Sequence, residues 1–117
     1  MKKKILLVED NPMIRELVQD ILEMEGYALS TVGSGSEALT LLKDESFDLI
    51  LTDIHLPKMD GVEFLERSRN LCGLIVAITS DSKASDGRSF QEVGFDGFIQ
   101  KPFKVAEFRA YIQTMLQ

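Results

Sequence analysis

Short β-rich runs alternate with stretches of helical periodicity along the whole chain. The β-rich runs lie at residues 5–8, 28–32, 49–52, 74–78 and 97–99. Parallel strands need long crossover connections, and a helix between two strands supplies one while covering a face of the sheet. The alternation therefore predicts an α/β fold with a single doubly wound, five-stranded parallel sheet and five helices. The second run is less apolar than the others, which favours a place at an edge of the sheet.

Helical patterns fill four of the segments between and after these runs. The first helix is predicted to begin at Pro12, which a first helical turn accepts, and to end at Gly26. Ser36 precedes the second helix, the third begins near Val62, and the last begins at Val105 and runs nearly to the end of the chain. The apolar residues expected on the inner faces are Ile14, Leu17, Val18, Ile21 and Leu22; Ala38, Leu39, Leu41 and Leu42; Phe64, Leu65 and Leu71; and Val105, Phe108, Ile112 and Met115.

The remaining segment, residues 82–93, has the composition of a weak helix. Ser82, Ser85, Gly87 and Ser89 all have low helix propensity. We predict the fourth helix here and expect it to be marginal.

Length and composition indicate one globular domain with protein or cation partners. A length of 117 residues fits one compact domain, which we assign to residues 1–117. The hydrophobic fraction of 44% and the charged fraction of 27% are near the averages for soluble proteins. A net charge of -6 argues against direct nucleic-acid binding and against attachment to a membrane surface.

The cysteine count and the short apolar runs indicate the compartment. Cys72 is the only cysteine, so no internal disulfide forms. The longest apolar runs are too short to cross a bilayer, and acidic residues follow the basic start too soon for a signal peptide. We expect a cytoplasmic protein.

Polar side chains close four of the five predicted strands. Glu9 and Asp10 follow the first, Asp53 the third, Thr79 the fourth, and Lys101 the fifth. Ligands of open α/β sheets bind outside the carboxyl ends of the strands, near the point where strand order reverses. A single acidic residue in such a place is ordinarily a cap or a turn former, but four strand ends that agree indicate a site.

These residue types suit phosphoryl transfer with Mg²⁺. Three carboxylates held together repel one another, so a cation is needed to keep all of them ionised. Mg²⁺ prefers oxygen ligands, and the lack of neighbouring histidine or thiolate ligands argues against zinc. An aspartate can attack phosphorus when the charge that gathers on the phosphoryl oxygens is offset. Lys101 can help to offset that charge, and the hydroxyl of Thr79 can donate a hydrogen bond to the same oxygens.

The run Asp-Ile-His-Leu-Pro-Lys-Met-Asp-Gly at residues 53–61 carries the first part of a family resemblance. Together with the acidic pair, it resembles the receiver domain of bacterial response regulators. The resemblance implies that Asp53 is the phosphoacceptor and that Glu9, Asp10 and Asp53 hold Mg²⁺. It also implies that His55, two residues after Asp53, ligates the metal through its backbone carbonyl.

The second part of the resemblance lies at the last two strand ends. Thr79 stands in the run Ala-Ile-Thr-Ser, and Lys101 precedes Pro102. The resemblance implies a site role for Lys101 and a switch role for Thr79 and Phe98, whose ring changes rotamer on phosphorylation. Without the resemblance, an aromatic on a short strand is about as often a core residue. Ser80 departs from the alanine or glycine that is frequent in the family, and we expect it to narrow access to the site.

The resemblance covers essentially the whole chain and implies a flavodoxin-like strand order of 2-1-3-4-5. It further implies a signalling domain that is not an enzyme in the ordinary sense, since it catalyses only its own aspartyl phosphorylation and dephosphorylation. The implied donors are a sensor histidine kinase or a histidine phosphotransfer protein. The implied output is a downstream protein, reached through the face formed by helix four, strand five and helix five. A phosphorylation-dependent homodimer is a further implied partner.

Three other functions stay open from the residues alone. A constitutive interaction module would keep the fold without cycling phosphate. A small phosphohydrolase would also use an aspartate nucleophile, although a second acid would be expected where His55 stands. A flavin binder would share the fold, but the three carboxylates would repel the cofactor phosphate.

Overall fold

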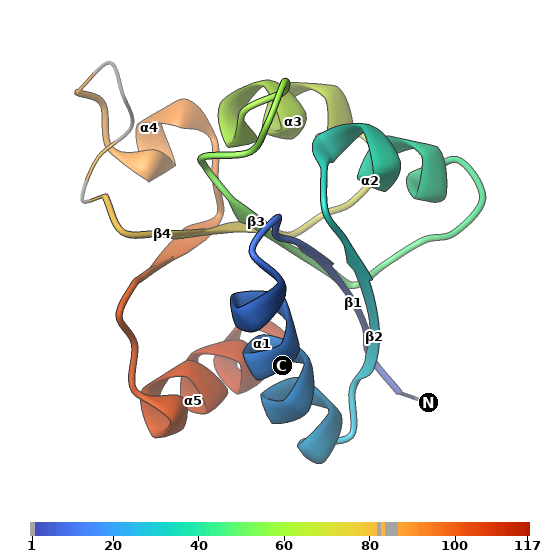
Figure 1. Ribbon diagram of the computed structural model, residues 1–117, viewed down its shortest axis with the longest axis vertical. Coiled ribbons are helices and arrows are strands. Elements are labelled where there is room, and N and C mark those ends of the chain that lie inside the picture. The colour runs from blue at the N-terminus through green and yellow to red at the C-terminus, as the bar shows by residue number, and fades with distance from the viewer. Residues whose placement is uncertain (1, 82, 84–86) are drawn as a thin grey trace.

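One parallel sheet forms the centre of the molecule. The computed structural model describes residues 2–81, 83 and 87–117. Within these residues, five strands pair in parallel in the order β2-β1-β3-β4-β5, which confirms the predicted order and places β2 at an edge (Figure 1). The strands are β1 (Lys4–Val8), β2 (Ala28–Val32), β3 (Leu49–Asp53), β4 (Ile75–Thr79) and β5 (Gly97–Gln100).

Helices cover both faces of this sheet, as predicted. On one face lie α2, α3 and α4, and on the other lie α1 and α5 (Figure 1). The helices are α1 (Pro12–Met24), α2 (Gly35–Leu42), α3 (Gly61–Ser68), α4 (Phe90–Val93) and α5 (Val105–Met115). No helix in the described ranges combines the length and the apolar character that crossing a membrane requires.

The central strands are buried on both faces. In β1, Ile5 and Leu7 belong to the core beneath α1 and α5, whereas Leu6 and Val8 belong to the core beneath the other helices. All five residues of β3 and all five of β4 are buried. A strand covered on both faces becomes a continuous apolar run, because alternate side chains enter different cores. This burial fixes the strand ends that carry the site.

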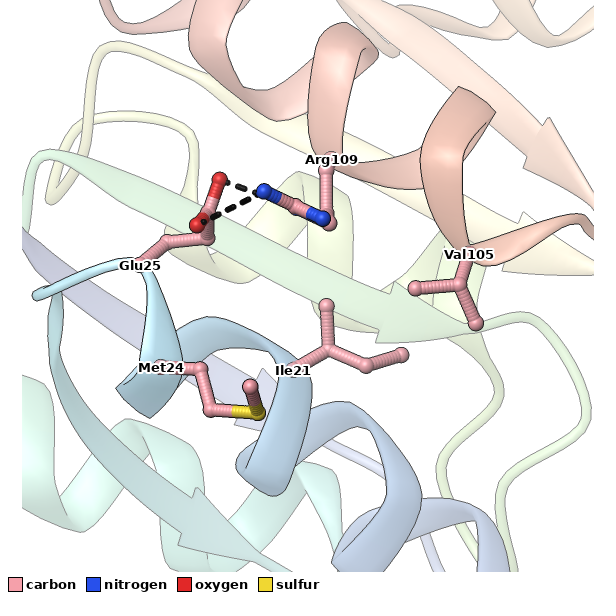
Figure 2. Close-up of a pocket in the computed structure, with 5 residues that line it drawn as sticks. All are labelled: Ile21, Met24, Glu25, Val105 and Arg109. Carbon is pink, nitrogen blue, oxygen red and sulfur yellow. Dashed lines mark hydrogen bonds and ion pairs between the residues drawn. The ribbon is translucent and has the colours of Figure 1, made fainter.

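Helix α1 begins and ends where the sequence indicated. Pro12 is its first residue, and the side chain of Asn11 caps it by accepting hydrogen bonds from the amides of Met13 and Ile14. Gly26 has a φ of 88°, a left-handed conformation that stops a helix and that glycine adopts without strain. At its C-terminal end, Glu25 forms an ion pair of 3.0 Å with Arg109 of α5 (Figure 2). The two helices on this face are thereby tied together.

Two helix predictions need small corrections. Helix α2 begins at Gly35, and Ser34 rather than Ser36 caps it, with its hydroxyl accepting the amide of Glu37 at 3.2 Å. Helix α3 ends at Ser68, so Leu71 lies beyond it and is 43% exposed instead of buried. Helical spacing could not show this, because it does not report where a helix stops.

Two other residues expected on inner helix faces are exposed instead. Leu17 of α1 is 48% exposed, and Val105, the first residue of α5, is 47% exposed.

The prediction for the fourth helix is wrong in length. Helix α4 covers only Phe90–Val93 in the described residues, and residues 83 and 87–89 are not helical. Ser82 and Ser85 lie outside the described residues. Gly87 has a φ of 86°, which is incompatible with a continuing right-handed helix. Ser89 then starts α4 with a capping box, in which its side chain and that of Glu92 exchange hydrogen bonds with each other's backbone amides.

Candidate functional site

The ends of β1 and β3 bring three carboxylates together. Glu9, Asp10 and Asp53 each offer a carboxylate oxygen, and these atoms lie within 4.8 Å of one another. Glu9 and Asp53 are buried, while Asp10 is exposed. The clustering follows from strand order, since β1 and β3 are neighbours with Val8 opposite Thr52. The residues that follow these two positions must therefore lie side by side.

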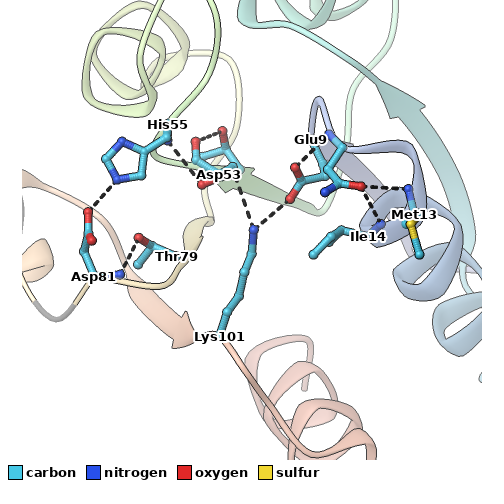
Figure 3. Close-up of polar contacts among 10 residues, drawn as sticks. Glu9, Met13, Ile14, Asp53, His55, Thr79, Asp81 and Lys101 are labelled. Atoms are coloured by element: carbon cyan, nitrogen blue, oxygen red, sulfur yellow. Dashed lines mark hydrogen bonds and ion pairs between the residues drawn. The ribbon is translucent and has the colours of Figure 1, made fainter.

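Both carboxylate oxygens of Glu9 accept hydrogen bonds from the protein. Its Oε1 accepts a hydrogen bond from Lys101 Nζ at 3.0 Å, and its Oε2 accepts one from the amide of Asn11 at 3.1 Å (Figure 3). Burial raises the pKa of the Glu9 carboxyl, and the bonds from Asn11 and Lys101 offset this only in part. Glu9 is thus a fixed acceptor at the floor of the cluster.

Lys101 lies between two of the carboxylates. Its Nζ is 3.0 Å from Glu9 Oε1 and 3.3 Å from Asp53 Oδ2 (Figure 3). Burial lowers the pKa of Lys101, but the hydrogen bond to Glu9 and the charge of Asp53 outweigh it, so the pKa is raised overall. The ammonium therefore stays protonated and offsets part of the cluster's negative charge. The peptide bond between Lys101 and Pro102 is cis, which the sequence alone left open.

The other oxygen of Asp53 faces the loop after β3. Asp53 Oδ1 accepts a hydrogen bond from the amide of His55 at 3.2 Å. Gly61 lies directly behind this loop, and its amide donates to the carbonyl of Ile54 at 2.7 Å. A Cβ at position 61 would lie only 2.6 Å from the carbonyl oxygen of Asp53, so no larger residue fits there without moving the backbone. Gly61 lets α3 press against the residue that carries the carboxylate.

Thr79 is fully buried at the end of β4. Its hydroxyl oxygen accepts a hydrogen bond from the amide of Asp81 at 3.0 Å (Figure 3). Its carbonyl accepts one from the amide of Lys101 at 2.7 Å. Asp81 in turn contacts the exposed ring of His55, with 2.5 Å between Oδ2 and Nε2 (Figure 3). The loops that follow β3 and β4 are thereby joined across the site. Because the Thr79 hydroxyl is the acceptor in its bond with Asp81, that bond does not use the hydroxyl proton.

Phe98 lies on β5, three residues before Lys101. It is 40% exposed, although its ring centroid is 5.2 Å from that of the buried Phe90 of α4. Phe98 is therefore neither a fully buried core residue nor a free surface residue.

The donor set of the cluster fits a hard divalent cation. Its three carboxylates supply oxygen ligands, the kind that Mg²⁺ and Ca²⁺ prefer. Within the described residues, the cluster contains neither a thiolate nor a ring nitrogen, so its chemistry does not favour zinc. Asp10 is the least enclosed of the three acids, since Glu9 and Asp53 are buried and each accepts hydrogen bonds from two donors.

Sequence reasoning did not find three residues that support the site. Asn11 and Asp81 act through backbone amides that donate to Glu9 and Thr79, and Arg15 donates to the carbonyl of Glu9 at 3.2 Å. Main-chain donors carry no residue-type signal. Asn11 before Pro12 could have been identified as a helix cap.

Comparison with known proteins agrees with this geometry. The family model for the response regulator receiver domain matches residues 5–113. The alkaline phosphatase synthesis transcriptional regulatory protein PhoP of Bacillus subtilis is 37% identical over 119 aligned residues, which cover 100% of this chain and 50% of that protein. The DNA-binding response regulator MtrA of Mycolicibacterium smegmatis is 34% identical, with 100% and 52% covered. The chain thus spans about half the length of these relatives.

Solved receiver domains have the same fold. The receiver domain of the sensor histidine kinase PA1611 from Pseudomonas aeruginosa, solved with magnesium in its active-site cleft, superposes with a TM-score of 0.87 at 29% identity, covering 99% of this chain and 98% of that one. A receiver domain protein from Methanospirillum hungatei gives a TM-score of 0.90 at 30% identity, covering 99% and 94%. With the family model, the relatives and the strand-end cluster in agreement, this chain belongs to the family of response regulator receiver domains, which are signalling domains of two-component systems.

Proposed function

We propose that Asp53 accepts a phosphoryl group from a phosphohistidine donor in a Mg²⁺-dependent reaction, and that residues 1–117 act as one domain that then changes conformation. The observation that carries this proposal is the Asp53 carboxylate, which lies in a cluster of three acids and 3.3 Å from Lys101 Nζ. A nucleophile, a cation site and a fixed positive charge are thus together at one strand end.

The metal ligands proposed are the carboxylates of Glu9, Asp10 and Asp53 and the backbone carbonyl of His55. Their oxygen donors fit Mg²⁺, and the solved receiver domain of PA1611 is described with magnesium in the corresponding cleft. When bound, Mg²⁺ would offset the negative charge of the carboxylates and of the phosphoryl oxygens. Asp10 is the most exposed of the three acids and would be the first that an arriving ion meets.

The transfer itself exchanges one bond for another. An oxygen of the Asp53 carboxylate attacks phosphorus, the P–N bond of the phosphohistidine breaks, and its electron pair returns to the imidazole nitrogen. Lys101 would neutralise a phosphoryl oxygen, and the Thr79 hydroxyl would donate a hydrogen bond to another. In the reverse direction of signalling, water attacks phosphorus, and the P–O bond to Asp53 breaks to release inorganic phosphate. The domain therefore acts only on itself.

The response is proposed to pass through Thr79 and Phe98. The amide of Lys101 already donates a hydrogen bond to the Thr79 carbonyl, so movement of either residue would be transmitted to β5. Changing a mostly inactive population into a mostly active one requires about 5 kcal/mol of differential stabilisation. Charge-assisted contacts of a phosphoryl group to Mg²⁺, Lys101 and Thr79 are of the kind that can supply it.

The partners proposed are proteins. A sensor histidine kinase or a histidine phosphotransfer protein would donate, and the face formed by α4, β5 and α5 would contact a downstream protein, an output domain or a second copy of the phosphorylated chain. The net charge of -6 does not favour contact of this domain with nucleic acid, although a relative twice as long is named as DNA-binding. The cytoplasm is the proposed compartment.

Incubation with Mg²⁺ and a small acyl phosphate tests the chemistry. The expected result is one added phosphoryl group in the intact mass, labile to hydroxylamine, and none in Asp53→Ala or when a chelator is present. Asp20→Asn, which changes an exposed aspartate of α1, is the matched control and should label like the wild type. Equal labelling of Asp53→Ala would refute the assignment, and no labelling of the wild type would favour a constitutive interaction module.

A further inference from the structure

Arg15 is a half-buried cation beside the acidic cluster that the proposed chemistry does not use. It is the fourth residue of α1, where the positive end of the helix dipole disfavours a cation. Helix stability therefore does not explain an arginine at this position. Its guanidinium donates a hydrogen bond from NH1 to the backbone carbonyl of Glu9 at 3.2 Å. The contact lies on the peptide unit that joins Glu9 to Asp10.

That peptide unit determines where Asp10 points. The amide of Glu9 donates to the carbonyl of Val32 at 3.0 Å, and its carboxylate is held by Asn11 and Lys101. The carbonyl, held by Arg15, is the remaining polar group of Glu9. Asp10 follows directly and is exposed, so its own side chain is not fixed by packing. The direction of Asp10 is set mainly by the backbone that Arg15 holds.

The turn after β2 leaves room for this guanidinium. A Cβ placed on Gly33 would lie 3.0 Å from Arg15 NH1, which is tighter than an ordinary van der Waals contact. The backbone of Gly33 is outside the left-handed region, so its conformation does not itself require glycine. A side chain at position 33 would therefore require the guanidinium of Arg15, which lies between the turns that follow β1 and β2, to shift.

We infer that Arg15 is a positioning residue for the divalent-cation site, which holds the Glu9–Asp10 peptide so that the Asp10 carboxylate stays beside Asp53. This inference rests on the Mg²⁺ site of the proposed function. Two effects of Arg15 on Mg²⁺ binding have opposite signs. As a nearby positive charge it repels the ion, and as a backbone clamp it favours the ion by keeping the ligands in place.

The sign of a substitution separates these two effects. Arg15→Met removes the charge and the hydrogen bond but keeps the apolar stem. If the clamp dominates, Mg²⁺ binding weakens by about tenfold, the lower end of the range for residues that orient metal ligands. Arg15→Lys keeps the charge and one donor, so it should restore part of the affinity. Arg109→Met removes one positive charge at the distant ion pair with Glu25 and should leave the affinity unchanged (Figure 2).

Gly33→Val tests the same clamp without changing any charge. The valine side chain would crowd the guanidinium and push it from its present position, so Mg²⁺ binding should weaken in the same direction as in Arg15→Met. This variant also decides the question if Arg15→Met does not fold. The measurement is a Mg²⁺ titration of each folded variant. Calorimetry and the amide chemical shifts of Asp10 and Asp53 are its two readouts.

The outcomes distinguish the inference from the function beneath it. Unchanged or tighter Mg²⁺ binding in Arg15→Met and Gly33→Val, with normal binding by the wild type, would overturn the inference alone. A wild type that does not bind Mg²⁺ would overturn the metal site and the inference with it. Weaker binding in both variants, with Arg15→Lys between them and the wild type, is the expected result.

Discussion

The sheet edge that carries the site has a central half, at the ends of β1 and β3, and an edge half, at the end of β5. These two halves are built very differently. Asp53 is the last residue of β3, and the acidic pair follows β1; both strands are almost wholly buried between two layers of helices. Lys101 follows β5, an edge strand in which buried and exposed residues alternate, and beside it lies α4, a helix of four residues in the described part of the chain. Chemistry needs groups that do not move, whereas a response needs an element that does. The molecule separates these requirements along the sheet.

The difference is also one of local stability. Elements with few buried contacts open at a smaller free-energy cost than the core does. In α4, the buried residue is Phe90, and its ring meets those of Phe95 and Phe98, both at the β5 edge. A change at Phe98 therefore reaches α4 directly. The central half is therefore expected to be rigid and the edge half to open at a smaller free-energy cost.

The largest effect is expected at Gly61. Gly61→Ala places a Cβ 2.6 Å from the Asp53 carbonyl oxygen and 2.7 Å from Ile54 Cα, both backbone atoms of the rigid half. We expect this overpacking to lower the free energy of unfolding by about 1–3 kcal/mol and to slow the labelling of Asp53. Gly73→Ala is the control, since a Cβ there meets nothing within 4 Å. Denaturant unfolding of both variants checks this. An equal loss of unfolding free energy in the two variants would mean that the backbone around Asp53 moves easily and is not rigid.

A second large effect concerns Asp10 and Mg²⁺. The proposed ion would bind only the assembled cluster, so Mg²⁺ should stabilise the folded chain by mass action. Asp10→Asn should weaken this binding on the order of tenfold, which is about 1.4 kcal/mol. Without Mg²⁺ the same variant should melt no lower than the wild type, because one of three repelling charges is gone. Thermal melts across a Mg²⁺ series decide this, with Asp20→Asn as the control. A melting temperature that does not respond to Mg²⁺ would count against the site.

Most of the sheet could be predicted because its signal is in residue types. Central strands buried on both faces become apolar runs, and the polar residue that ends each run falls at the same edge. The convergence of Glu9, Asp53 and Lys101 followed from strand order alone. The ends of the strands were predicted less exactly. Strand β4 extends to Thr79 because of its backbone pairing, which residue types do not reveal.

Both misplaced helix starts share one cause. Ser34 and Glu37 at the start of α2, and Ser89 and Glu92 at the start of α4, have the spacing of a capping box. That spacing marks where α4 begins, whereas the serine and glycine content of residues 82–93 indicated only that the helix would be weak. The hydrogen bond from Arg15 to the carbonyl of Glu9 could not be predicted, because it depends on the direction that a long side chain takes across a turn.

A moderate effect is expected when Lys101 is replaced. In Lys101→Ala the carboxylate and the metal ligands remain, so a small acyl phosphate should still label Asp53 in the presence of Mg²⁺. The link between the phosphoryl group and β5 is lost, so the amide shifts around Phe98 should change less than in the wild type. Lys104→Ala, an exposed lysine three residues later, is the control. Equal shifts in all three proteins would place the response outside β5.

The smallest effect separates the two halves most directly, because the same atom is removed from each. Ser34 caps α2, whose Ala38 and Leu42 lie in the core, and Ser89 caps α4. Losing a cap costs about 1 kcal/mol where the helix unfolds only with the whole domain. Ser34→Ala should therefore lower the melting temperature. In Ser89→Ala the cost should appear mainly as faster hydrogen exchange at the amides of Val93, Gly94 and Phe95, which close α4, with a smaller change in melting temperature. If α4 unfolded only together with the whole domain, as α2 is expected to do, both variants would show the same fall in melting temperature. The amides that close α4 would then exchange only at the rate set by global unfolding. The soft edge would then not exist, and the response to phosphorylation would have to arise in the loops around Asp53.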